Sequence, residues 1–99
     1  MGKKEEKKMI DFTKCKVEQI DGTFTEEDLS GIAKDIANMV FKGANELSVY
    51  NACIDIYKTG KCEWEQKVVD AFKYIIDNLL IGGEPASIVL KKALLLAME

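Results

Sequence analysis

Histidine and arginine are both missing from this chain of 99 residues. Histidine is the side chain whose pKa normally lies near neutral pH, so the commonest general acid or base is not available. Arginine binds phosphate groups and guanine edges through paired hydrogen bonds, and all fourteen cations here are lysines instead. A lysine-only composition also fits an AT-rich genome. The chain therefore lacks histidine-based catalysis and the bidentate recognition of phosphate or guanine that arginine provides.

Cysteine is scarce, with Cys15, Cys53 and Cys62 and no C-x-x-C motif. An odd number of scattered cysteines is typical of reduced thiols in a cytosolic protein. Without histidine, three scattered thiols do not make the four-ligand set of a structural zinc site. We expect three free thiols, with Cys53 as a small core residue, and neither a metal nor a cofactor.

Long apolar segments are missing too, since no stretch approaches the ~20 residues of a transmembrane helix. Met1 and Gly2 begin like a myristoylation signal, but Glu6 stands where serine or threonine is needed. The basic start leads directly to Asp11, whereas the basic start of a signal peptide leads to an apolar stretch. We expect no membrane contact and a cytoplasmic location.

The overall composition is that of one globular domain. Apolar residues make up 47% and charged residues 31% of the chain, and the net charge is −3, which gives no general attraction to nucleic acid or anionic membranes. Residues 1–8, MGKKEEKK, have nothing to bury and predict a charged flexible tail. Residues 9–99 are long enough for a single domain with its own core.

The segment after the tail predicts a β-hairpin. Residues 9–20 alternate between apolar and polar, but the phase changes between Phe12 and Cys15, which indicates a strand with a bulge near residues 13–14. Asp21-Gly22 is a strong signal for a tight turn, and Thr23-Phe24 would begin the returning strand.

Four segments with apolar residues at helical spacing follow. Thr25, before three acidic residues, predicts an N-cap, and so does Asn45. Pro85 suits the first turn of the last helix. The predicted helices are residues 25–42, 46–59, 64–81 and 85–98, with Gly43, Gly60 and Gly82-Gly83 ending the first three. The fold class is thus α+β and mostly helical, with an N-terminal β-hairpin and a small four-helix domain.

The second helix has an apolar arc of about 180°, which predicts a place in the middle of the domain. We expect Tyr50 and Tyr57 in the core and Tyr74 at the surface. The side chains expected to be largely buried are Ile32, Ile36, Leu47, Ile54, Trp64, Phe72 and Ile76.

The last segment, residues 88–98, reads IVLKKALLLAM, and nine of its eleven residues are apolar. On a helix they span roughly 200°, more than the ~100° stripe that one intramolecular contact needs. The excess predicts a homo-oligomer, since exposed contiguous apolar surface usually marks an interface. The alternative is that the hairpin covers it within one chain. The predicted interface residues are Ile88, Leu90, Leu94, Leu95 and Met98.

Catalytic motifs are missing: the sequence holds no P-loop, dinucleotide-binding, nucleophile-elbow or zinc-protease pattern. Asp70 and Asp77 could imitate a carboxylate pair, but both fall on predicted solvated faces. The first two helices could form a helix-turn-helix, but Lys58 is the single cation on the polar strip of the second. We therefore expect no enzyme activity and no catalytic residues.

Three stretches of the sequence, IDFTKCKVEQIDG, DLSGIAKDIANMVF and ACIDIYKTGKCEWE, cover roughly residues 10–65. Together they resemble small uncharacterised proteins of phages and mobile elements of gut bacteria. The resemblance implies a bacterial cytoplasm as the setting and transfers no functional residue.

Two functions stay open at this point. The leading hypothesis is a non-enzymatic interaction or structural accessory protein, homo-oligomeric, that also engages a host or phage protein. The alternative is a small nucleic-acid-binding regulator of a mobile element.

Overall fold

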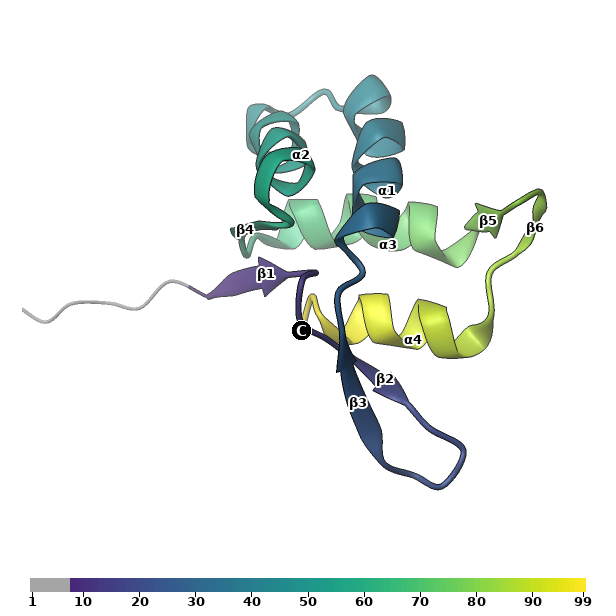
Figure 1. The fold of residues 1–99 in the computed structure, drawn as a ribbon. Helices are drawn as coiled ribbons and strands as arrows, with labels where there is room; N and C mark the ends of the chain where they lie inside the picture. The colour runs from purple at the N-terminus through teal and green to yellow at the C-terminus, as the bar shows by residue number, and fades with distance from the viewer. Residues whose placement is uncertain (1–7) are drawn as a thin grey trace, which may run out of the picture.

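The computed structural model describes residues 8–99, and these form four helices and three two-stranded antiparallel sheets (Figure 1). The predicted α+β class, with its N-terminal β-hairpin and four helices, is confirmed. The predicted tail falls, except for Lys8, outside the described residues. The elements in chain order are β1 (Met9–Asp11), β2 (Cys15–Glu18), β3 (Phe24–Glu27), α1 (Ser30–Gly43), α2 (Leu47–Thr59), β4 (Lys61–Glu63), α3 (Gln66–Asp77), β5 (Leu80–Ile81), β6 (Glu84–Pro85) and α4 (Ile88–Leu96).

The N-terminal segment forms two strands rather than one bulged strand. The Asp11 carboxylate accepts a hydrogen bond from the Thr13 N–H at 2.9 Å, and this local turn ends β1. β1 then pairs with β4, with Ile10 opposite Cys62, whereas β2 pairs with β3 as the hairpin. The turn explains the change of phase that suggested a bulge, because it lets residues from both strands reach the core.

Thr25 does not cap a helix, because residues 24–27 form β3 opposite β2. α1 begins later, at Ser30, whose N–H donates to the Asp28 carboxylate at 2.9 Å. The β-branched Thr25 fits a strand, and its pairing with Val17 outweighs the local cap signal.

The remaining helix boundaries also differ from the predicted ones. Glu46, and not Asn45, occupies the N-cap position of α2, which ends as predicted at Gly60, with φ of 80°. α3 is shorter at both ends than predicted. Its expected last turn instead forms β5, which pairs with β6 around Gly82 and Gly83, two glycines with positive φ.

The start of α4 was also predicted too early. Pro85 lies in β6, and α4 begins only at Ile88. Ser87 is the N-cap, since its hydroxyl accepts a hydrogen bond from the Leu90 N–H at 3.2 Å.

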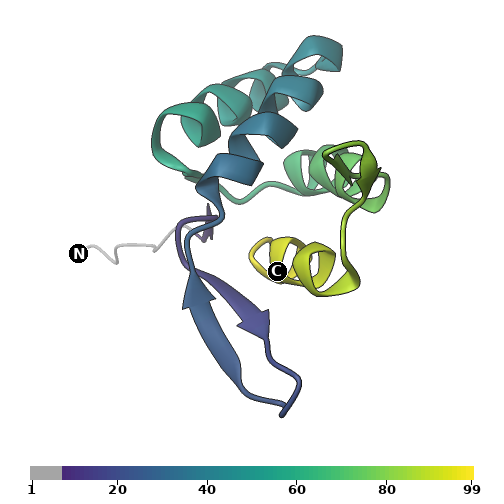
Figure 2. The ribbon, with the colours of Figure 1, turned by 45° about the vertical axis from the view of Figure 1, so that its right-hand side comes forward.

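α1 and α2 lie side by side as an antiparallel pair, α3 covers one face of this pair, and α4 runs beside α3 and against β2 (Figures 1 and 2). Phe12 and Phe72 are completely buried at the centre, with ring centroids 6.1 Å apart. The expected burial of Ile36, Phe72 and Ile76 is confirmed.

The predicted core also included residues that are only partly buried or are exposed. Ile32, Ile54 and Trp64 are only partly buried. Leu47 is 72% exposed, and Tyr50 and Tyr57 are also exposed, so their assignment to the core was wrong. The reason is that α3 covers only one face of the α1–α2 pair. Tyr74 is exposed, as predicted.

Candidate binding surfaces

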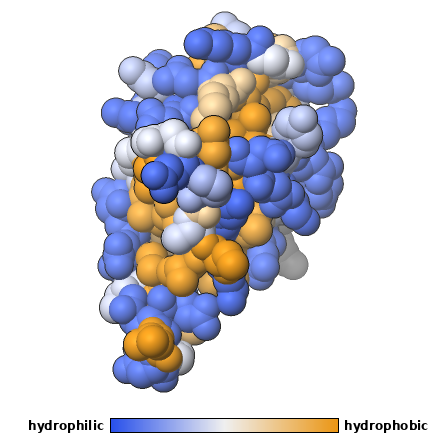
Figure 3. Space-filling model, turned by 90° about the vertical axis from the view of Figure 1, so that its right-hand side faces the viewer, coloured by the Kyte–Doolittle hydropathy of each residue, from blue (hydrophilic) through white to orange (hydrophobic). Residues whose placement is uncertain are grey.

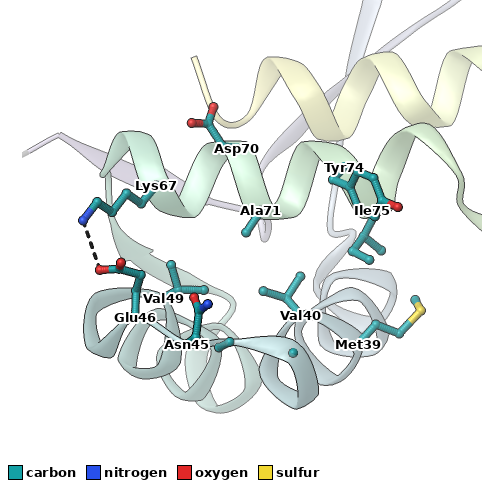
Figure 4. A pocket seen from close by; sticks show the side chains of 12 residues that line it. Met39, Val40, Asn45, Glu46, Val49, Lys67, Asp70, Ala71, Tyr74 and Ile75 are labelled. Atoms are coloured by element: carbon teal, nitrogen blue, oxygen red, sulfur yellow. Dashed lines mark hydrogen bonds and ion pairs between the residues drawn. The ribbon is translucent and has the colours of Figure 1, made fainter.

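A cleft of about 550 Å³ lies between α3 and the end of the α1–α2 pair that holds its connecting turn (Figure 4). Its apolar wall includes Val40 from α1, Val49 from α2 and Ala71 from α3. At one end the Lys67 ammonium lies 3.0 Å from the Glu46 carboxylate. The cleft is thus apolar inside and closed at one end by an exposed ion pair.

The polar side chains that line this cleft include Lys67, Glu46 and Asp70. Glu46 raises the pKa of Lys67 through a hydrogen bond and its charge, which keeps that lysine protonated. Asp70 is exposed and accepts a hydrogen bond from the Gln66 side chain. A cleft of this size lies in the range of small-ligand sites.

The predicted interface residues of α4 separate into two groups. Leu94 is completely buried and Met98 is 2% exposed, so both belong to the core of a single chain. Leu90 and Leu95 are half-buried, while Ile88 is 74% exposed. Leu94 and Met98 are therefore out of reach of a second copy, and only Ile88 projects freely.

Part of the apolar arc of α4 is covered by β2, in line with the alternative that the hairpin folds over it. The Lys92 ammonium on α4 lies 3.0 Å from the Glu18 carboxylate on β2 and joins the two elements. Val89 and Leu96 remain partly exposed beside Phe24 of β3, which is itself 55% exposed.

We call Phe24, Ile88, Val89 and Leu96 the α4 surface. Phe24, Val89 and Leu96 line a hollow of about 330 Å³ together with two lysines and two glutamates: Lys16, Lys92, Glu18 and Glu99. Leu80 and Ile81 of β5 are exposed as well, and the face of the molecule in Figure 3 carries apolar patches along its middle. Sequence analysis missed Phe24, because its position beside α4 depends on how the hairpin packs.

The three cysteines are buried, free thiols. Burial raises the pKa of Cys62 to about 12, with the Asp55 carboxylate adding to the effect, and raises that of Cys53 to about 11. Burial and then the charge of Asp11 raise the pKa of Cys15 to about 11. A thiol with a raised pKa is mostly protonated and is a poor nucleophile.

We therefore predict that the folded protein reacts very slowly with Ellman's reagent at mildly alkaline pH, whereas all three thiols react at once in concentrated guanidinium chloride. Because the folded state keeps these thiols protonated longer than the unfolded state does, the fold should lose stability as the pH rises from the usual thiol pKa of 9.0 to about 11 or 12. Rapid labelling of any thiol in the folded protein would contradict the burial described here.

Other kinds of site find no support among residues 8–99. No group of three or more cysteine, aspartate or glutamate side chains gathers there as a metal site. Within the same range, no helix has the length and apolar character needed to cross a membrane. α1 and α2 lie antiparallel, whereas the helices of a helix-turn-helix cross steeply. Comparison of the chain with family models, curated proteins and solved structures gives no match.

Proposed function

We propose that this protein is a non-enzymatic interaction protein that self-associates through the α4 surface. The observation that carries the proposal is the exposure of Ile88, at 74%, next to Val89 on α4, which lines a hollow together with Phe24 and Leu96. Apolar side chains that gather on an otherwise charged surface usually mark a contact with another protein.

The charges around this surface favour a second copy as the partner. The hollow beside Phe24 carries two cations and two anions, namely Lys16, Lys92, Glu18 and Glu99. Lys92 and Glu18 already pair within the chain. In a two-fold dimer each side presents the same residues, so Lys16 of one copy can pair with Glu99 of the other.

The edge of β3 is a less suitable route to self-association. Glu26 and Glu27 are exposed there, so pairing two such edges would bring like charges together. This supports a contact through side chains of the α4 surface rather than a continuous sheet.

The resemblance of residues 10–65 to small proteins of phages and mobile elements suggests the setting. In that setting the dimer would be an accessory protein in a bacterium, and its further partner would be a host or phage protein.

Ile88→Glu tests the proposed interface. We expect the variant to be monomeric at tens of micromolar, because a two-fold contact would bury two unpaired carboxylates. Its thermal stability at low concentration should be nearly unchanged, since surface substitutions usually alter the free energy of unfolding by less than about 0.5 kcal/mol. Sedimentation equilibrium measures the mass.

Tyr74→Glu is the matched control, because Tyr74 is 71% exposed but lies at the cleft on α3. It should leave the molar mass unchanged. If Ile88→Glu and the intact chain have the same mass, the α4 surface is not the interface and the proposal is wrong.

A further inference from the structure

A second exposed surface lies on the α1–α2 pair, on the side away from α3. Val40 and Val49 point from this pair toward α3, which lies on that side (Figure 4). On the other side a hollow of about 180 Å³ is lined almost entirely by apolar atoms. Its lining residues are Ala37, Asn38, Phe41, Cys53, Ile54 and Tyr57.

Aromatic rings form the walls of this hollow. Phe41 stacks on Tyr50 with ring centroids 5.0 Å apart, and Tyr57 is 51% exposed. Rings fixed in this way lose little conformational entropy on binding, which is why tyrosine is frequent at the energetic centre of interfaces. The volume suits one aliphatic side chain inserted between the two helices.

The charge of this surface differs from that of the α4 surface. The Lys34 ammonium lies 5.2 Å from the centre of the Tyr57 ring, and the exposed Lys58 follows Ile54 by one helical turn. None of the six lining residues is acidic. A second copy would bring lysines against lysines here, so charge complementarity favours an acidic partner.

We propose that the hollow between α1 and α2 binds an acidic amphipathic helix of another protein. One leucine or isoleucine of that helix enters the hollow between Phe41 and Tyr57, and glutamate or aspartate residues one turn away pair with Lys34 and Lys58. Two antiparallel helices with an apolar groove between them are a common receptor for a third helix. The proposal is independent of the α4 surface.

A peptide selection tests this directly. The library contains peptides of about 20 residues, long enough to form helices, with leucine at one helical stripe and either glutamate or lysine at each flanking position. Selection on the full chain should enrich glutamate at the flanking positions. An enriched peptide should bind Lys34→Glu at least about tenfold more weakly than the intact chain, a loss of ~1.4 kcal/mol.

Lys73→Glu, the same exchange on α3, is the matched control and should change the affinity less than about twofold. Ile88→Glu should bind the peptide as the intact chain does, which separates this proposal from the one on self-association. The proposal is wrong if no peptide is enriched, if lysine is enriched instead of glutamate, or if Lys34→Glu binds as well as the intact chain. It is also wrong if Lys34→Glu alters the molar mass, since the surface would then be a contact between copies.

Discussion

Replacing Leu94 by glutamate is expected to unfold the chain rather than to produce a folded monomer. Leu94 is completely buried between α4 and the rest of the core. A carboxylate at this position would have no cation to pair with among the buried residues, which are all apolar. We expect a loss of at least about 4 kcal/mol in the free energy of unfolding, comparable with the whole stability of many small domains.

Circular dichroism during thermal unfolding measures this effect, and Leu96→Glu on the same helix is the control. Leu96 is 39% exposed, so its substitution should leave the helical signal and most of the stability intact. A Leu94→Glu protein that melts like the intact chain would show that α4 packs with a different face inward.

Truncating Phe72 to alanine should lower the free energy of unfolding by about 3–5 kcal/mol, the usual cost of removing a buried aromatic ring. Phe72 is completely buried and its ring centroid lies 6.1 Å from that of Phe12. The truncation leaves a cavity where α3 meets the N-terminal segment, and the surrounding backbone can close it only in part. Urea denaturation followed by Trp64 fluorescence measures the change.

The control for this truncation is Tyr74→Ala, since Tyr74 lies on the same helix but is 71% exposed. Its substitution should cost less than about 0.5 kcal/mol. A loss below about 1 kcal/mol for Phe72→Ala would mean that α3 does not face the core as described.

The elements with strong periodicity could be predicted from the sequence. Apolar residues at helical spacing located all four helices, and Gly60 marked the end of α2. The sequence did not indicate which strands pair with each other in the sheets. β1 pairs with β4, more than fifty residues away along the chain at Ile10 and Cys62, and no local signal encodes that contact.

The prediction of a helix cap was wrong where tertiary contacts competed with a local preference. Thr25 followed by acidic residues satisfies the rules for an N-cap, yet it pairs with Val17 in the hairpin. Gly82-Gly83 correctly predicted a break between the last two helices. The strands β5 and β6 on either side of it were not predicted, so α3 ends earlier and α4 begins later than expected. A strand of two residues is too short to show the alternation of apolar and polar residues by which strands are predicted.

The predicted interface residues differ in exposure, and the interface itself stays a prediction. The apolar arc of α4 is wider than one contact needs, and Ile88 does remain exposed. The sequence did not indicate which part of the arc faces inward, because Leu94 and Ile88 are equally apolar. That choice depends on β2 and α3, the two elements that pack against α4.

The molar mass of the intact chain in solution tests the central claim most directly. Sedimentation equilibrium at tens of micromolar and moderate salt should give twice the mass of the 11.1 kDa chain, and the mass should fall toward that of one chain on dilution. A folded protein that stays at 11.1 kDa over the whole concentration range would contradict self-association through the α4 surface.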